Sequence, residues 1–212
     1  DIFNIPTRVF RGFENIGDEY GMIMAVLGGD DSGGGVIWAP QVLDAASRHG
    51  LILSETGHLY DTKKGEKLPH GQNPVSKLTE EDLSTIAEVP VTGIVRDYVA
   101  RYWDLMALSK KEPCLVIGEE GLIKDKPGFE VEFISSKSVA ERLYRTNRYE
   151  VLMPVKGNWK LSWQGHETIL NSGDTCLLKP GIEHSLMALD ESESSLYRIT
   201  NTDDSAGLTW KE

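Results

Sequence analysis

The most informative run of residues in this chain is Tyr144-Arg145-Thr146-Asn147-Arg148-Tyr149-Glu150. Six residues separate Glu150 from Gly157, and a second group follows with Gly173-Asp174, Pro180-Gly181 and His184. Glycine and proline at such positions are typical of tight turns between strands. The two groups therefore predict short strands joined by turns, and they contain the polar residues Glu150 and His184.

Short strands are expected throughout the C-terminal half of the chain. Partly alternating apolar residues, bounded by turn residues such as Pro127-Gly128 and Gln164-Gly165, predict them. Many short strands at this spacing favour a sandwich or a jelly-roll barrel, so we predict a fold dominated by β-structure. The predicted strands cover residues 114–117, 129–133, 149–153, 159–163, 168–170 and 196–199.

A few helices are expected before residue 112. Pro40 near the start and Gly50 just past the end predict a helix between them. Thr79 and Asp82 have the spacing of a capping box, which predicts the start of a second helix. Apolar side chains along one face predict a third helix over residues 95–108.

The first residues of the chain repeat the outline of the turn that ends at His184. Arg11 stands in the early copy where the later copy has His184. An internal repeat predicts two homologous barrels, the first represented only by its second half, so we expect a segment to precede Asp1. The alternative is that the early segment is an N-terminal strand of one decorated barrel. The matching pairs are Ile5-Pro6 with Leu178-Lys179-Pro180, and Val9-Phe10 with Ser185-Leu186.

Residues 140–200 resemble the cupin superfamily. Its signature is a His-x-His-x3–4-Glu-x6-Gly run followed by a Gly-Asp...Pro-Gly-x-x-His turn, and this chain has Tyr144 and Thr146 at the places of the two leading histidines. The resemblance implies a cupin jelly-roll β-barrel. With residues 1–27 as the remnant of a preceding barrel, the chain resembles the C-terminal portion of bacterial bicupins.

A narrower resemblance is to the ring-cleaving non-haem iron bicupins, particularly the large subunits of two-component hydroquinone dioxygenases. It implies the second half of an N-terminal cupin barrel in 1–39, a helical and loop connection between barrels in 40–111, and a C-terminal cupin barrel in 112–212. The runs that carry it are 10–15, 27–31 with Trp38-Ala39-Pro40, and 153–159.

The resemblance also implies a divalent metal, often iron, bound by both signature segments. Imidazole and carboxylate ligands hold Fe(II) on one side and leave positions for O2 and a phenolate. Only Glu150 and His184 of this chain map onto ligand positions. Tyr144 can ligate as a phenolate once a metal ionises it, whereas Thr146 is a poor ligand for iron. A barrel with two protein ligands is also consistent with the loss of the metal.

Two functions are therefore predicted. The first is a dioxygenase that acts on an aromatic diol such as hydroquinone, with Glu150 and His184 as metal ligands and Tyr144 and Arg145 as catalytic residues that orient the substrate. The second is a metal-free subunit that binds an aromatic or anionic ligand, or supports a catalytic partner chain, through Arg145 and Arg148. In the second case Trp159 and Trp163 are expected nearby.

A purely structural interpretation of the two polar residues also stays open. Glu150 then pairs with Arg145 or Arg148 inside the barrel, because a buried ion pair is a common reason for such a carboxylate. His184 is then a hydrogen-bonded structural residue.

The composition of the chain limits the kinds of molecule that it is expected to bind. The chain has 33 acidic and 22 basic residues, a formal net charge of −11, which disfavours nucleic acid and anionic membranes. No apolar run approaches the roughly 20 residues that cross a bilayer, and no signal peptide is recognisable. We expect a cytoplasmic protein that binds a small aromatic molecule. Because the edges of half a barrel need a partner, we also expect an oligomer.

Overall fold

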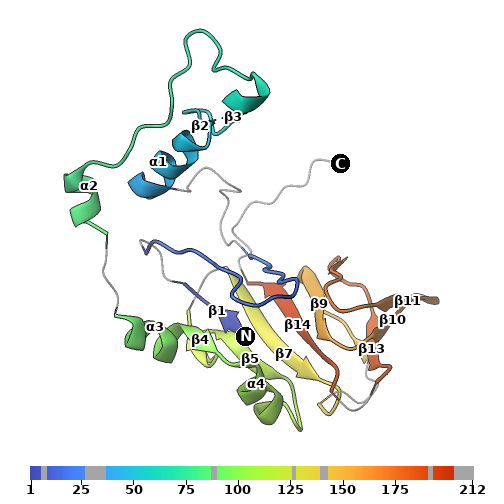
Figure 1. Ribbon diagram of the computed structural model, residues 1–212. Helices are drawn as coiled ribbons and strands as arrows, with labels where there is room; N and C mark the ends of the chain where they lie inside the picture. Colours follow the sequence, from blue (N-terminus) through green and yellow to red (C-terminus); the bar gives the residue numbers. More distant parts are fainter. Residues whose placement is uncertain are drawn as a thin grey trace. The chain divides into compact units, whose positions relative to one another are not determined.

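The structure is a computed structural model, and it describes residues 1–5, 9–26, 37–86, 90–125, 128–138, 143–190 and 193–202 (Figure 1). These residues divide into two compact units. The larger unit contains 1–5, 15–26 and 90–202, and the smaller unit contains 9–14 and 37–86.

Two sheets make up most of the larger unit. One has six strands in the order β12-β9-β14-β7-β5-β6, and the other has four in the order β11-β10-β13-β8. Between β7 and β14 the chain passes repeatedly from one sheet to the other, as in a jelly roll. The prediction of a β-dominated jelly roll with a few helices is confirmed. The strands are β5 (Cys114–Gly118), β6 (Ile123–Lys124), β7 (Phe129–Ser135), β8 (Leu143–Tyr144), β9 (Glu150–Lys156), β10 (Trp159–Trp163), β11 (His166–Leu170), β12 (Cys176–Leu178), β13 (His184–Ala188) and β14 (Ser195–Asn201).

The remaining described elements are short. The predicted capping box is confirmed, since the Thr79 hydroxyl accepts the Asp82 N–H and the Asp82 carboxylate accepts the Thr79 N–H. The helix predicted after Pro40 is also confirmed. The elements are α1 (Pro40–Arg48), α2 (Glu80–Ser84), α3 (Val91–Tyr98), α4 (Tyr102–Leu108), the 3-10 turn η1 (Thr62–Lys64), and the paired strands β1 (Ile2–Phe3) with β4 (Val99–Ala100) and β2 (Leu51–Leu53) with β3 (Leu59–Asp61).

The single helix predicted over residues 95–108 is wrong. Its middle residues form β4, in which Ala100 pairs with Ile2 of β1. The Asp1 carboxylate accepts the Tyr102 N–H at 2.8 Å, which satisfies a backbone donor at the start of α4. Because Asp1 is 101 residues away in the sequence, local periodicity cannot indicate the break.

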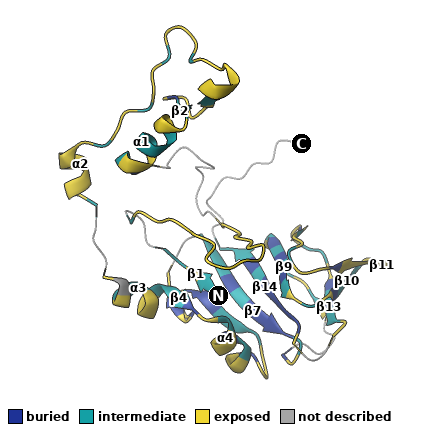
Figure 2. Ribbon diagram, in the orientation of Figure 1, coloured by how far each residue is buried: buried dark blue, intermediate teal, exposed yellow. Residues whose placement is uncertain are grey.

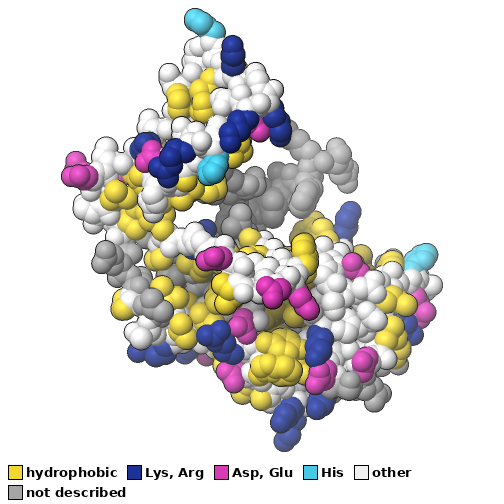
Figure 3. All heavy atoms as spheres, in the orientation of Figure 1, with side chains coloured by type: hydrophobic (Ala, Val, Ile, Leu, Met, Phe, Trp, Pro, Cys, Tyr) yellow, Lys and Arg dark blue, Asp and Glu magenta, His cyan; other side chains and the backbone are white. Residues whose placement is uncertain are grey.

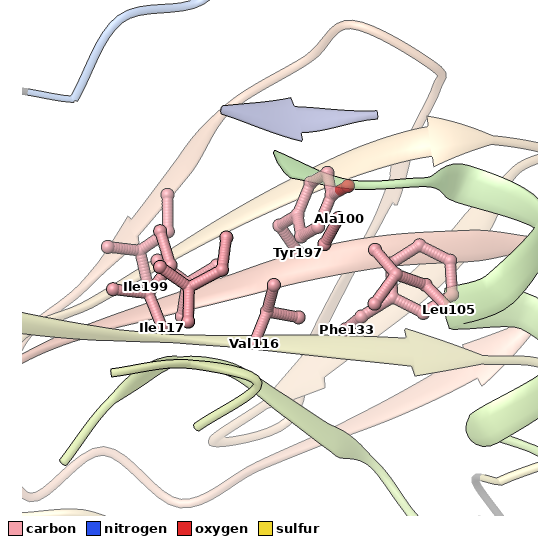
Figure 4. Close-up of a cluster of buried hydrophobic side chains, with 9 residues drawn as sticks. Ala100, Leu105, Val116, Ile117, Phe133, Tyr197 and Ile199 are labelled. Atoms are coloured by element: carbon pink, nitrogen blue, oxygen red, sulfur yellow. The ribbon is translucent and has the colours of Figure 1, made fainter. Parts of the chain in front are cut away.

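The central strands of the six-stranded sheet carry buried side chains on both faces. Side chains of β5, β6, β7 and β14 on one face form a cluster with Ala100 and Leu105 (Figure 4). On the other face Ile134, Leu152 and Leu196 pack against side chains of the four-stranded sheet. Buried residues accordingly gather on β7, β9 and β14 (Figure 2). This second cluster is the interior of the barrel.

The structure explains why residue 157 is a glycine. Gly157 turns the chain between β9 and β10 with a φ of 72°, which side chains rarely tolerate. A Cβ atom at Gly157 would lie 2.0 Å from Ser194 Oγ and 2.8 Å from Ser194 Cβ. Glycine is therefore required both for the backbone conformation and for space.

The described part of residues 1–39 contains one strand, β1, which pairs within the larger unit. Residues 27–31 and Pro6, which belong to the patterns of the resemblance and of the repeat, lie outside the described residues. The division of the chain into 1–39, 40–111 and 112–212, with half of another barrel in the first part, stays a prediction.

We predict that Leu152→Ala lowers the free energy of unfolding by about 2–5 kcal/mol, because it opens a cavity in the barrel interior. Leu152 is 0% exposed, whereas Leu177 on the paired strand β12 is 53% exposed. Leu177→Ala is the matched control, with an expected change within about 0.5 kcal/mol. Urea unfolding of both variants measures the difference, and equal losses would contradict the assignment of the core.

Candidate functional site

Strand pairing brings the predicted site residues together. His184 begins β13 and pairs with Tyr144 of β8 in the four-stranded sheet. Glu150 begins β9 and pairs with Thr200 of β14 in the six-stranded sheet. The backbone N–H of Gly181 donates to the Thr146 carbonyl at 2.7 Å, which ties the two signature segments to each other. The segments therefore meet between the sheets.

Glu150 and His184 face each other inside the barrel. Their side chains are 4% and 0% exposed, and Glu150 Oε2 lies 3.3 Å from His184 Nε2. The two groups are not aligned for a hydrogen bond, and neither atom has another hydrogen-bond partner among the described residues. Two buried polar atoms thus lie side by side without the partners that such atoms usually have.

The other ring nitrogen of His184 fixes its tautomer. Nδ1 lies 3.3 Å from the carbonyl oxygen of Ile182, to which a protonated Nδ1 donates. Nε2 of the neutral ring then carries the lone pair, and this lone pair is on the side of Glu150. In this tautomer Nε2 can accept a hydrogen bond or coordinate a cation.

Burial raises the pKa of the Glu150 carboxyl above its usual value. The neighbouring His184 ring and Arg198 guanidinium oppose this effect, and the Glu132 carboxylate adds to it. The protonated, neutral form of Glu150 is therefore favoured more than in a solvated glutamate.

Arg198 and Glu132 form a second polar pair beside the first. They are directly opposite each other on β14 and β7. Arg198 Nε donates to Glu132 Oε2 at 2.7 Å, and Nη2 lies 2.5 Å from the same oxygen. The guanidinium carbon lies 5.1 Å from the centre of the Tyr144 ring, whose other ring contact is with His184 at 5.9 Å. Arg198 and His184 together hold the Tyr144 ring.

Glu132, Tyr144, Glu150 and Arg198, but not His184, line a pocket of about 350 Å³ at one end of the barrel. Its lining contains three arginines, two carboxylates and three hydroxyl side chains, and neither Trp159 nor Trp163 is part of it. The lining residues are Glu132, Tyr144, Arg145, Thr146, Arg148, Glu150, Arg198 and Thr200.

The signature arginines lie on the exposed side of this pocket. Arg145 is 61% exposed and lies 3.6 Å from Glu183, so it pairs with that residue and not with Glu150. The Arg148 side chain is exposed, and no described residue pairs with it. The Thr146 hydroxyl accepts the Arg148 N–H at 3.2 Å, a contact that shapes the loop. The ion pairs of Glu150 with Arg145 or Arg148, which the structural interpretation expects, are not formed.

The residues present do not fit a three-ligand iron site. Among the described residues, no group of three or more His, Cys, Asp or Glu side chains can hold a metal ion. Glu150 and His184 supply two donors, while Arg198 places a permanent positive charge in the same pocket. A facial iron site needs a third ligand, and a nearby guanidinium opposes a dication.

Sequence reasoning missed Glu132 and Arg198. Each lies on a strand in which the neighbouring residues are apolar and point to the opposite face. A polar residue in such an alternating pattern is usually expected to face solvent. The available signal was an oppositely charged pair on two predicted strands of one barrel. Only the register of those strands shows that the pair lies inside.

Comparisons with known proteins give matches of structure alone. No family model matches the chain, and no curated protein matches its sequence. A cupin-2 domain protein from Shewanella frigidimarina is similar over 49% of this chain and 95% of its own, with 17% identity and a TM-score of 0.39. A cupin 2 conserved barrel domain protein from Salinispora arenicola covers 42% of this chain and 74% of its own, with 17% identity and a TM-score of 0.35.

A putative ethanolamine utilization protein Q from Salmonella typhimurium is similar at 15% identity and a TM-score of 0.35, over 42% of this chain and 67% of its own. Likenesses of this size carry no argument about function. The jelly roll itself is evident from the strand order. None of the described helices has the length and apolar character of a membrane span.

We predict that Glu150→Gln becomes more stable relative to the wild type as pH rises. The raised pKa means that the folded protein binds the Glu150 proton more tightly than the unfolded chain does, so the wild type loses stability from about the usual value of 4.5 upward. Glutamine has no charge to lose, and its amide can donate to His184 Nε2. Urea unfolding between about pH 4 and about pH 7 measures the trend, and a constant difference would contradict the raised pKa.

Proposed function

We propose that the barrel is a metal-free binding module for a small anionic molecule, which enters the pocket between β7, β9, β14 and β8. The observation that carries the proposal is the lining of that pocket, in which three arginines outnumber two carboxylates. A guanidinium donates paired hydrogen bonds to a planar anion and keeps its charge at every physiological pH. The lining thus supports recognition of a carboxylate or phenolate.

The charge of the pocket is opposite in sign to that of the chain. The chain carries a formal net charge of −11, and its acidic and basic side chains are interspersed on the face that Figure 3 presents. Within the pocket, Arg198 neutralises Glu132, and burial favours the neutral form of Glu150. Arg145 pairs with Glu183, so Arg148 leaves an excess of positive charge, which attracts anions.

The size of the pocket also suits a small ligand. A volume of about 350 Å³ is at the lower end of the range of roughly 300–1,000 Å³ that is usual for small-molecule sites. Tyr144 adds an aromatic surface to the polar groups. A ligand with one ring and one acidic group is therefore compatible with the space and the chemistry.

The iron-dependent dioxygenase for an aromatic diol is the second candidate. One observation favours it, namely the Nε2 lone pair of His184 beside the Glu150 carboxyl. Tyr144 lines the pocket and Arg145 lies at its exposed side, positions compatible with a role in orienting substrate. The missing third ligand makes it the weaker proposal.

We predict that the protein binds benzoate with one molecule per chain and binds benzamide at least about tenfold more weakly. The two ligands have nearly the same shape, but only benzoate carries the charge that the arginines recognise, and a charged hydrogen-bonded pair contributes about 1.5–3 kcal/mol. Isothermal titration calorimetry of both ligands measures the ratio. Equal affinities, or no binding of benzoate, would remove the anion-binding proposal.

We also predict that anaerobic loading with Fe(II), followed by removal of free metal, leaves much less than one iron per chain. Two protein ligands beside a guanidinium give a weak site. Elemental analysis of the wild type, Glu150→Ala and His184→Ala tests this expectation. Near-stoichiometric iron in the wild type that is lost in both variants would favour the dioxygenase, and oxygen uptake with hydroquinone would then be the next measurement.

A further inference from the structure

Arg198 differs from the other two arginines of the pocket in how firmly it is held. Its side chain is 13% exposed, whereas that of Arg145 is 61% exposed. Nε and Nη2 are both directed at Glu132 Oε2 from across the strand pair, and the guanidinium lies over the Tyr144 ring. A ligand that meets this group does not have to immobilise it, so little conformational entropy is lost on binding.

The contacts of Arg198 leave one edge of the guanidinium for a ligand. Glu132 occupies the edge formed by Nε and Nη2. The edge formed by Nη1 and the second N–H of Nη2 has no hydrogen-bond partner among the described residues, and Arg198 lines the pocket. Two parallel N–H groups on one edge match the two oxygens of a carboxylate.

The neighbouring carboxylates restrict the charge of that ligand. Glu132 and Glu150 lie in the same pocket as Arg198. A doubly charged phosphate group would bring two negative charges beside the Glu132 carboxylate, whereas a carboxylate brings one negative charge spread over two oxygens. The pocket therefore suits a monoanionic, planar group better than a phosphate.

We propose that the free edge of the Arg198 guanidinium, anchored by Glu132, is the specificity-determining contact for the carboxylate of the ligand. This inference rests on the proposed anion-binding function and assigns its main contact to a residue outside the signature segments. Arg198 supplies in this barrel the fixed positive charge that a metal ion supplies in a metal-binding one. Arg145 and Arg148, which are exposed and screened by solvent, attract the ligand without orienting it.

The test measures benzoate and benzamide affinity for the wild type, Arg198→Lys, and the double variant Glu132→Gln with Arg198→Gln. The lysine variant keeps the charge and loses the paired donors, so benzoate affinity should fall at least about tenfold while benzamide affinity changes little. The double variant removes both partners of the ion pair, so Glu132 is not left as a carboxylate without its cation. It should abolish the preference for benzoate.

Arg101→Gln is the matched control. Arg101 also pairs with a carboxylate, Asp1, at 3.0 Å, and it is not part of the pocket. It should bind benzoate within about threefold of the wild type, since the removed charge is remote and screened. Melting curves of all variants verify that they fold.

A measurement on the wild type does not depend on the stability of any variant. Benzoate should shift the side-chain nitrogen resonances of Arg198 in NMR spectra, and inorganic phosphate should shift them much less. If the wild type prefers benzoate over benzamide but the Arg198 variants and resonances do not respond, this inference is overturned and the proposed function stands. If the wild type binds no benzoate or shows no preference, both are overturned.

Discussion

The period of two residues in β7, β9 and β14 is the constraint on which the rest of the structure depends. Because successive side chains of a strand point to opposite faces, Val131 and Phe133 belong to one apolar cluster while Ile134 belongs to the other. A sheet that is buried on both faces needs apolar residues at nearly every position. Glu132 and Glu150 depart from that rule at one end of the barrel, and the departure creates the pocket.

Charges placed inside a barrel require partners, and this requirement organises the site. The strand register puts Arg198 directly opposite Glu132, so the pair is satisfied across two adjacent strands. The guanidinium then packs on Tyr144, which stacks on His184. A series of contacts thus runs from the Glu132 carboxylate on β7, through Arg198 and Tyr144, to His184 in the four-stranded sheet. Glu150 forms no such pair with an arginine, and burial raises the pKa of its carboxyl although His184 and Arg198 oppose this effect.

The sequence analysis identified the part of the site that lies in the two signature segments, because the spacing of their residues is recognisable. Glu150, His184 and Tyr144 belong to these segments, which strand pairing brings together, and the turn at Gly157 is also recognisable from the sequence. Arg198 and Glu132 are 66 residues apart, and their meeting depends on which strands become neighbours. The break between α3 and α4 escaped prediction for a similar reason, because pairing with β1 fixes it. Contacts distant in sequence therefore account for both failures.

Tyr144 and Thr146, which stand where the cupin pattern that this chain resembles has its leading histidines, differ from histidine in more than metal binding. An imidazole at position 144 would be a donor to a cation, but the tyrosine ring present there offers its face to a guanidinium. The Thr146 hydroxyl accepts a backbone N–H of its own loop. Both substitutions therefore suit a barrel whose positive charge is carried by a side chain. The Arg198 guanidinium is anchored by a carboxylate and carries a charge that needs no metal, so under the binding function proposed above ligand selection depends on hydrogen-bond geometry.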